Sequence, residues 1–460
     1  GRGGGSTGFE GWIDEVQIFN TTLSAAQIAQ LYDDGAANLA GPTSIVPQET
    51  SATDVWDLDV HPFDSGSTLM PLVSSSNTVT ITAPSPTVEL NNGTTTLPTD
   101  QNLTAQVTDF GEAQGAYTWT ADGNPFMTLN MPFNSGATQF DYSGVGTNGT
   151  NSGASFSGIS QGLCQVGGCL SFDGVSSNVN LNRIQSTLMT ASDGTMSVWV
   201  RPIGAAPVVG TVYGGDLIIG DSSYVGLYRA SISGEDRIWA HNWDVNEDRV
   251  GTTYAVDAWN HIVWVHGSGR LSIYKDGVLI RSVLSGNNGN MAANMNLGRI
   301  GSGEPFAGLL DEVQVFNRVL SVDQIEQLYT DGLANLTGPT LIVDSETTAG
   351  QVWDLDLTPF EGDGSVFSAV PSANTVTITT PVVTVQLNNG DTLVSTYEDV
   401  TSQVTGFAAA PQGAYNWSVN GSDYMTLNMP FNSGATQFNY SGSGINGTVS
   451  GSAFSAQGNA

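Results

Sequence analysis

Apolar and polar residues alternate in short runs along most of the chain. Residues 77–81 (NTVTI) and 384–387 (TVQL) alternate with a period of two, which is typical of strands with one buried face. Residues 271–280 (LSIYKDGVLI) hold two such runs joined by Asp276-Gly277, a dipeptide that favours the tight turn of a β-hairpin. Gly, Asn and Asp separate the runs. The pattern predicts an all-β protein.

One helical pattern interrupts the strands, and it occurs twice. Residues 23–32 (LSAAQIAQLY) and 320–329 (LSVDQIEQLY) carry apolar side chains at helical spacing. Ser24 and Ser321 each precede a glutamine by three positions, which fits a capping box at the start of a helix. The residues that suit the C-terminal stop are Gly35 and Gly332.

The helix recurs because the chain repeats itself. Residues 9–20 (FEGWIDEVQIFN) align with 306–317 (FAGLLDEVQVFN) at an offset of 297 residues. One residue is inserted near Ala410, after which residues 127–140 return unchanged as 425–438. Self-similarity at a fixed period marks an array of reused units. The chain therefore holds about one and a half copies of a large unit.

Several segments of this unit carry a family resemblance. They are LSFDGVSSNVNL (170–181), MSVWVRP (196–202), WNHIVWVH (259–266) with the hairpin that follows it, and FAGLLDEVQVFNRVLSVDQIEQLY (306–329). In this order they resemble a LamG-like, concanavalin A-type jelly-roll sandwich. The resemblance implies one complete jelly roll that opens at LNMPF (129–133) and closes with the second helix.

The remaining segments resemble an immunoglobulin-like β-sandwich in two pieces. Residues 351–378 look like its last strands, and residues 87–124 look like its first three. Trp119 stands where such sandwiches often bury a tryptophan, although no cysteine pair flanks it as in antibody domains. The pieces lie on either side of the jelly roll and together have the length of one domain. We therefore expect the jelly roll to be inserted into a loop of an Ig-like domain.

A plain string of domains is the alternative, in which residues 36–126 form a sandwich of their own. Contact between Trp119 and Trp353 favours insertion, whereas contact between Trp119 and Trp56 favours the string. The insertion predicts seven segments: 1–35, the C-terminal part of a jelly roll; 36–82, the C-terminal half of an Ig-like domain; 83–126, the N-terminal half of a second; 127–335, the complete jelly roll inserted in it; 336–381, the C-terminal half of that Ig-like domain; 382–424, the N-terminal half of a third; and 425–460, the start of the next jelly roll.

The chain is acidic, with a net charge of −32 although only 12% of its residues are charged. Such a surface repels phosphate, so nucleic acid and anionic lipid are excluded as partners, whereas divalent cations fit. No apolar run approaches the 18 residues of a membrane span, and no signal peptide is visible at Gly1. We expect an extracellular or cell-surface location without membrane contact in this part of the chain.

The resemblance also implies a structural calcium ion, because similar jelly rolls often hold one. Asp311 of the Asp311-Glu312 pair is the expected ligand, with Asp141 and Asp173 as partners. The alternative is that Asp311 only caps a turn or accepts backbone hydrogen bonds. Neighbouring side chains on a strand point to opposite faces, so Asp311 and Glu312 are not expected to flank one substrate bond.

Two further sites are predicted from local clusters. Cys164 and Cys169 span a glycine-rich loop and suit a local disulfide outside the cell, with a pair of reduced thiols as the alternative. Trp239, Trp243 and Asp244 (in WAHNWD) suit a sugar platform, in which rings stack on pyranose faces and polar groups bind hydroxyls. The alternation of that segment fits a core-facing strand equally well.

Nine sequons permit N-glycosylation in a cell that has the machinery. They are Asn20, Asn92, Asn102, Asn148, Asn335, Asn416, Asn420, Asn439 and Asn446.

No nucleophile, base or metal triad emerges, so we expect a non-catalytic extracellular structural or adhesive protein: a stalk, fibre or giant adhesin. Its lateral jelly rolls would contact glycans, proteins or other copies. One alternative is a carbohydrate-binding region of a larger secreted enzyme. Another is a filament subunit in which residues 382–426 and 36–81 complete one another between chains. The terminal jelly-roll pieces argue against the filament, because a joined jelly roll would lack the counterpart of residues 163–297. A piece of a longer chain is the simpler interpretation.

Overall fold

The computed structural model is all-β with two α-helices among the residues that it describes. These are residues 9–63, 68–110, 114–134, 138–146, 148–158, 163–211, 215–222, 225–242, 248–286, 293–300, 305–360, 365–406, 414–425, 436–437 and 447–448. The chain divides into two compact units, residues 1–380 and 381–460. No helix among the described residues is long and apolar enough to cross a membrane.

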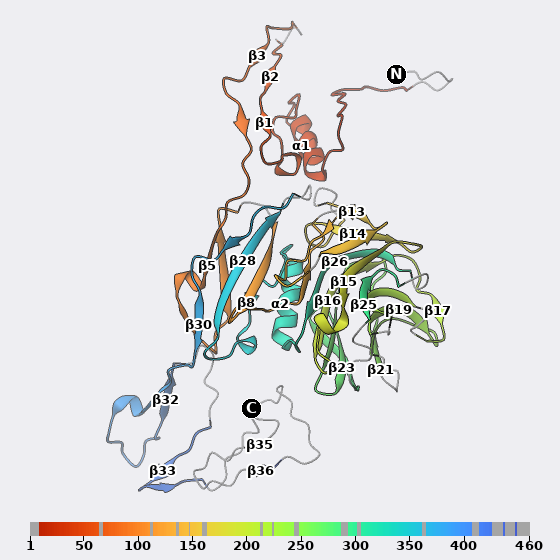
Figure 1. Cartoon of the computed structure of the whole chain (residues 1–460). Coiled ribbons are helices and arrows are strands. Elements are labelled where there is room, and N and C mark those ends of the chain that lie inside the picture. The colour runs from red at the N-terminus through yellow and green to blue at the C-terminus, as the bar shows by residue number, and fades with distance from the viewer. Residues whose placement is uncertain are drawn as a thin grey trace. The chain divides into compact units, whose positions relative to one another are not determined.

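Two large, mainly antiparallel sheets make up a jelly roll in the first unit (Figure 1). The first follows the order β13 (Ser155–Ser157), β14 (Cys169–Asp173), β26 (Ala307–Phe316), β16 (Gly194–Pro202), β22 (Asn260–Gly267), β23 (Arg270–Lys275) and β24 (Val278–Leu284), with β10 (Leu129–Met131) also paired to β26. The second follows the order β11 (Thr138–Gln139), β12 (Gly149–Ser152), β15 (Asn178–Ile184), β25 (Asn294–Leu297), β18 (Asp216–Asp221), β19 (Gly226–Ile232), β20 (Glu235–Asn242) and β21 (Asp248–Thr252), with β17 (Val208–Val209) paired to β19.

The alternation along these strands builds the core between the two sheets. Val198 and Ile262 from one sheet and Leu227 and Ala240 from the other are fully buried in one apolar cluster. The hairpin expected over residues 271–280 forms as β23 and β24 and turns at Asp276-Gly277, where both residues have positive φ. The inward rows therefore come from the period-two pattern in the sequence.

Strands from before and after the jelly roll form a second, smaller sandwich. One of its sheets holds β27 (Leu341–Ile342), β7 (Leu103–Thr108) and β5 (Thr87–Leu90). The other holds β6 (Thr96–Pro98), β30 (Val376–Thr379), β28 (Val352–Phe360), β8 (Gln114–Ala121) and β9 (Asn124–Pro125), with β29 (Val370–Pro371) paired to β28. β8 pairs with β28 along its whole length, with Trp119 opposite Leu355, so one sheet contains strands from both sides of the jelly roll.

One apolar core joins this sandwich to the jelly roll. Trp119 and Trp353 meet edge to face with ring centroids 6.4 Å apart. The ring centroid of Phe126 lies 5.6 Å from that of Trp353 and 5.5 Å from that of Phe316 in the jelly roll. The indole N–H of Trp119 donates to the carbonyl of Pro339 at 2.8 Å. Figure 1 shows the second helix between the two sandwiches, where its apolar side chains join the same cluster.

Both helices begin at the expected serines. In α1 (Ala25–Ala36) the Ser24 hydroxyl accepts from the N–H of Gln27 at 3.1 Å. In α2 (Val322–Leu333) Ser321 does the same with Gln324 at 3.2 Å. Each serine satisfies an N–H that the first turn leaves unpaired.

The expected helix stops are wrong. α1 and α2 run through Gly35 and Gly332, and the left-handed residues lie three positions later, at Asn38 (φ 59°) and Asn335 (φ 58°). Asparagine tolerates the left-handed conformation, which explains why asparagine can stand at this position where glycine is more usual. Gly332 is needed for packing instead, because a Cβ there would lie 2.3 Å from Nε1 of Trp199.

The outer parts of the chain hold short strands. Residues 36–82 contain β1 (Val55–Trp56) paired with β4 (Val79–Thr80), and β2 (Asp59–Val60) paired with β3 (Val73–Ser74). The second unit contains the pairs β31 (Thr384–Leu387) with β32 (Ser402–Thr405), β33 (Ser418–Val419) with β34 (Ser422–Asp423), and β35 (Thr436–Gln437) with β36 (Gly447–Thr448). Short 3-10 turns lie at Pro47–Glu49, Asn91–Gly93, Gln185–Thr187, Asp344–Glu346 and Asn388–Gly390.

Candidate functional site

The outer face of the β12–β15–β25 part of the nine-stranded sheet carries a row of polar side chains. Register places Thr150 opposite Asn180, and Asn180 opposite Asn296. Their neighbours Val179 and Leu297 are buried in the core, so the row faces away from it. We call this surface the asparagine face; its members are Thr150, Asn178, Asn180, Asn182, Asn294 and Asn296.

Amide groups on this face are exposed or half-buried and held in fixed positions. The Nδ2 of Asn182 donates to the Thr150 hydroxyl at 2.9 Å and to the Asn148 carbonyl at 2.7 Å. The Nδ2 of Asn296 donates to the carbonyl of Asn294 at 3.0 Å. The amides of Asn180 and Asn296 each offer two donors and two acceptors, more than their hydrogen bonds in the structure use. The face can therefore hydrogen-bond a flat, hydroxyl-rich ligand.

Sequence reasoning missed this face, although the signal was present. NVNLN (178–182) and NMNL (294–297) put asparagine at every second position of two strands. Asparagine is depleted in strands, so a period-two run of it on one face is unusual. The pairing of β15 with β25 could not be predicted, because they lie more than a hundred residues apart.

The sugar platform that the sequence predicts differs from the asparagine face, because its first tryptophan is buried. Trp239 lies on β20 and points away from the main core, because its neighbours Ile238 and Ala240 point into that core. Its ring is only 9% exposed and packs in a small cluster with Ala230 and Ile232. Trp239 is therefore buried in apolar packing, as the alternative expects, but in this small cluster and not between the two sheets. The ring has little free face on which a sugar could stack. Trp243 and Asp244 lie outside the described residues.

Two arginines flank the Trp239 ring. The guanidinium carbons of Arg237 and Arg249 lie 6.0 Å and 5.5 Å from its centroid, and its Nε1–H donates to the Ala230 carbonyl at 3.1 Å. Gly251 is the cross-strand partner of Trp239, and a Cβ there would come within 2.7 Å of the indole. The indole is thus a fixed part of the sheet surface with cations on its faces.

The three aspartates expected to bind calcium have separate hydrogen-bond partners. The Oδ2 of Asp311 accepts from the backbone N–H groups of Gln165 (3.1 Å) and Val166 (2.9 Å). Asp173 accepts from the backbone of its own turn, including Val175 at 2.9 Å, and these bonds hold the pKa of its carboxyl far below the ordinary value.

Asp141 accepts from the backbone N–H groups of Asn130 and Ser143, both at 3.0 Å, and lies 3.5 Å from the Arg183 guanidinium. Across the described ranges, no three His, Cys, Asp or Glu side chains converge as a metal site requires. The structure therefore does not bring the three aspartates together. Asp311 accepts backbone hydrogen bonds, as the alternative to calcium binding predicts.

Cys164 and Cys169 are disulfide-bonded, with their Cα atoms 5.4 Å apart. The loop that they close supplies both backbone donors to Asp311. A carboxylate on the central strand β26 thus fixes the position of this loop.

Asp311 and Glu312 do not alternate as neighbours on a regular strand do. Ser197 pairs with Gln314 and Trp199 pairs with Asp311, so β26 has one extra residue in this interval. Glu312 has φ of 47°, which is typical of a β-bulge.

Leu310 and Val313, on either side of the pair, both point into the core, so the bulge leaves Asp311 and Glu312 together on the other face of the sheet. Both carboxyl groups are buried there, which corrects the expectation that they point to opposite faces. Burial raises the pKa of both, and for Glu312 the charge of Asp311 adds to the effect.

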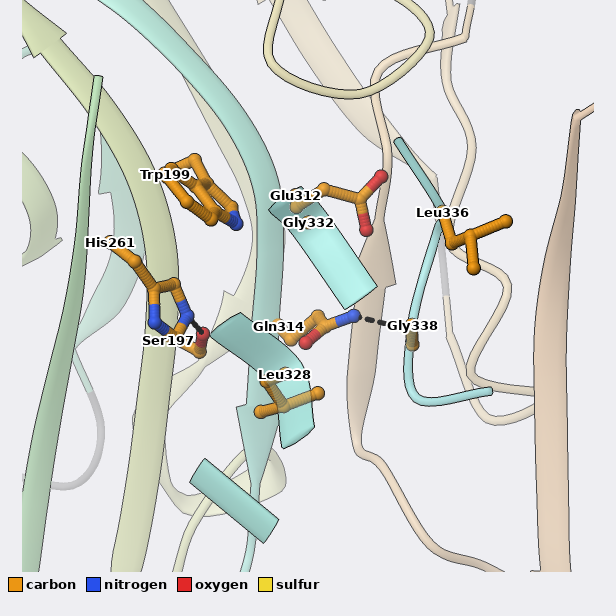
Figure 2. Close-up of a pocket in the computed structure, with 9 residues that line it drawn as sticks. All are labelled: Ser197, Trp199, His261, Glu312, Gln314, Leu328, Gly332, Leu336 and Gly338. Carbon is orange, nitrogen blue, oxygen red and sulfur yellow. Dashed lines mark hydrogen bonds between the residues drawn. The ribbon is translucent and has the colours of Figure 1, made fainter. Parts of the chain in front are cut away.

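Beneath α2 the structure leaves a small chamber of about 10 Å³ beside the bulge, the space of one water molecule (Figure 2). Figure 2 shows the hydroxyl of Ser197 bonded to Nε2 of His261 at 2.8 Å. Glu312 enters from the other side, where its Oε1 accepts from the Thr337 hydroxyl at 3.0 Å. The Oε2 of Glu312 and the Nδ1 of His261 are buried without a protein partner.

This chamber pairs a serine with a histidine, as nucleophilic catalysis requires, but leaves no room for a substrate. Ser197 and His261 are each 1% exposed. Burial lowers the pKa of His261 to about 4, so its ring is neutral at pH 7. The chamber has room for about one water molecule and no more.

The described sequons all lie at exposed positions: Asn20, Asn92, Asn102, Asn148, Asn335, Asn416 and Asn420. Asn439 and Asn446 lie outside the described residues.

Part of the jelly roll is similar to a known protein family. Residues 173–326 match the Laminin_G_3 family, described as the concanavalin A-like lectin/glucanases superfamily. No curated protein matches the chain.

Similar solved structures include domain 4 of AbnA, an extracellular arabinanase from Geobacillus stearothermophilus, in complex with arabinotriose. It is 16% identical, with a TM-score of 0.35, over 44% of this chain and 98% of that one. The receptor-binding domain of botulinum neurotoxin type G is 19% identical, with a TM-score of 0.34, over 44% of this chain and 51% of that one. Trypanosoma rangeli sialidase is 15% identical, with a TM-score of 0.33, over 46% of this chain and 34% of that one. The family match and the two packed sheets show a jelly-roll domain that is similar, over residues 173–326, to the concanavalin A-like lectin/glucanases superfamily.

Proposed function

We propose that the chain is a section of a repetitive extracellular protein with a structural and adhesive role. Ig-like sandwiches would form its axis, and each would hold a LamG-like jelly roll that contacts glycans through the asparagine face. The observation that carries the proposal is the pairing of β8 with β28, which brings the two flanks of the jelly roll into one sheet.

This pairing has a mechanical consequence. The chain reaches the jelly roll from β8 and β9 and returns from α2 to β27 and β28, so both connections belong to the sandwich. Tension along the axis would then act on the sandwich. The jelly roll would not transmit this force, because both of its connections lead back to the same sandwich. The shared core at Phe126 and Phe316 would fix the jelly roll in place rather than leave it on a flexible linker.

The asparagine face supports glycan contact by its chemistry. Its amides and the Thr150 hydroxyl present donors and acceptors at strand spacing, which suits the hydroxyls of a sugar. Asn180 and Asn296 are half-buried and opposite each other, so they would bind one sugar together.

A glycan array tests this proposal directly. We expect the full chain to bind a subset of glycans and the double variant Asn180→Ala/Asn296→Ala to bind them at least tenfold more weakly, because each lost hydrogen bond is worth about 1 kcal/mol. Asn317→Ala, at an exposed asparagine after β26, is the matched control and should bind normally. No binding across the array, or equal binding by the double variant, contradicts the glycan role.

A further inference from the structure

Backbone groups fix the orientation of two amides at the centre of the asparagine face. The Oδ1 of Asn180 accepts from the backbone N–H of Asn182 at 2.8 Å. The Nδ2 of Asn296 donates to the backbone carbonyl of Asn294 at 3.0 Å. A backbone N–H needs an oxygen partner and a carbonyl needs an N–H, so neither amide can turn over without losing its hydrogen bond.

The amide atoms that remain are complementary. Within the described residues, neither the Nδ2 of Asn180 nor the Oδ1 of Asn296 has a hydrogen-bond partner, and both atoms reach solvent. Asn180 lies opposite Asn296 where β15 and β25 run side by side (Figure 1). Side chains directly opposite in a sheet are neighbours. The face therefore presents a free donor beside a free acceptor.

A donor beside an acceptor suits two neighbouring hydroxyl groups of a sugar. Every hydroxyl can both donate and accept, so one can accept from Asn180 while the next donates to Asn296. A carboxylate or sulfate group can only accept. In place of the second hydroxyl it would set a negative oxygen against the amide oxygen of Asn296 and leave that acceptor unpaired.

The charges around the face also favour a neutral ligand. All six members of the face are uncharged. Arg183 of β15 is buried, donates to the Thr187 carbonyl at 2.7 Å and lies 3.5 Å from Asp141. Arg299 lies beyond the end of β25 and donates to the carbonyl of Ser176 at 3.4 Å. The face itself has no cation with which to bind an acidic sugar, and the net charge of −32 repels one.

The polar row is longer than one sugar contact. Register continues from Asn180 to Thr150 on β12 and then to Thr138 on β11. Neighbouring strands lie about 4.8 Å apart, so the row from Thr138 to Asn296 crosses four strands and spans about 14 Å. Threonine hydroxyls, like amides, can pair with sugar hydroxyls. A ligand that follows the row must contain more than one sugar unit.

We propose that the asparagine face selects neutral oligosaccharides, with Asn180 donating to one hydroxyl and Asn296 accepting from its neighbour. Glycans whose hydroxyls are replaced by acidic groups are rejected. The inference rests on the proposed glycan role and deepens it by naming the class of glycan.

Calorimetric titration of the full chain tests this selectivity. The probes are a neutral oligosaccharide that the chain binds on the array and the same oligosaccharide after exhaustive O-sulfation, which leaves no hydroxyl pair intact. We expect the neutral form to bind about tenfold or more tightly. The preference should persist at about 1 M salt, where charges are screened beyond about 3 Å, because the sulfated form still lacks the hydroxyl donor.

Equal or tighter binding of the sulfated form overturns the inference and leaves the glycan role in place. So does a preference that disappears at high salt, because long-range repulsion and not the donor–acceptor pair would then set it. Binding of neither form overturns the glycan role, and the inference falls with it.

Two variants test the assigned residues. Asn180→Asp keeps the oxygen that accepts from Asn182 but replaces the free donor by an acceptor. We expect it to bind the neutral form about tenfold or more weakly. Binding equal to that of the unmodified chain overturns the role of Asn180.

Asn296→Lys removes the free acceptor and adds a cation. We expect it to bind the neutral form more weakly and the sulfated form about tenfold more tightly than the unmodified chain does. Asn317→Lys, which adds the same charge at an exposed position after β26, is the matched control and should keep the preference for the neutral form. An equal change in both lysine variants overturns the role of Asn296.

Discussion

At the scale of single residues, burial decides the chemistry of the charged and titratable groups. Asp311 and His261 lie on neighbouring parts of one sheet face, yet their partners differ. Asp311 accepts three backbone hydrogen bonds, including one from Glu312 at 2.9 Å, and fixes the disulfide loop. His261 has one hydroxyl partner and a buried Nδ1 without a hydrogen-bond partner. Asp311 thus supports the fold through its hydrogen bonds, and His261 does so only while its ring is neutral.

His261 should therefore make stability depend on pH in the acid range. Its pKa is about 4 in the fold, against 6.5 for an ordinary histidine, so the unfolded chain binds its proton first. The stabilisation is complete above pH 6.5 and is lost as the pH falls toward 4. We expect the melting temperature of His261→Gln to fall less between pH 7 and pH 4.5 than that of the unmodified chain. His61→Gln, at an exposed histidine, is the control and should leave the pH dependence unchanged; equal slopes in all three proteins would refute this account.

At the scale of elements, sequence patterns predict the type of each element better than its exact geometry. The period-two runs, the Asp276-Gly277 turn and the serine caps all appear where the pattern puts them. The bulge at Glu312 does not follow from the pattern, because an extra residue in a strand depends on its partner strand. The asparagine face depends on the pairing of β15 with β25, which is equally non-local.

Helix α2 and its counterpart α1 offer a matched test of packing. Gly332 lies against Trp199, and a Cβ there would approach Nε1 to 2.3 Å, whereas nothing lies within 4 Å of a Cβ at Gly35. We expect Gly332→Ala to lower the free energy of unfolding by about 1–3 kcal/mol, because the interior must shift to admit the methyl group. Gly35→Ala should be neutral or stabilising, since alanine favours helices. Thermal unfolding measures the stability of both variants. Equal effects would show that Gly332 is not needed for packing against Trp199.

At the scale of the whole molecule, the central claim is that the jelly roll is inserted into a sandwich whose two halves flank it in sequence. The alternative, a string of separate domains, predicts that Trp119 contacts Trp56 instead. In the insertion, Trp119 packs on Trp353 and its neighbour Thr120 lies opposite Asp354. In the string, Thr120 would lie opposite Asp57, the counterpart of Asp354 one repeat earlier.

Disulfide trapping within one chain distinguishes the two arrangements most directly. A chain with Thr120→Cys and Asp354→Cys is compared, under dilute oxidising conditions, with a chain that carries Thr120→Cys and Asp57→Cys, and the bonds are mapped by mass spectrometry. The insertion predicts a rapid 120–354 disulfide within single chains and no intrachain 57–120 disulfide. A 57–120 disulfide in place of the 120–354 bond would contradict the account and establish the string.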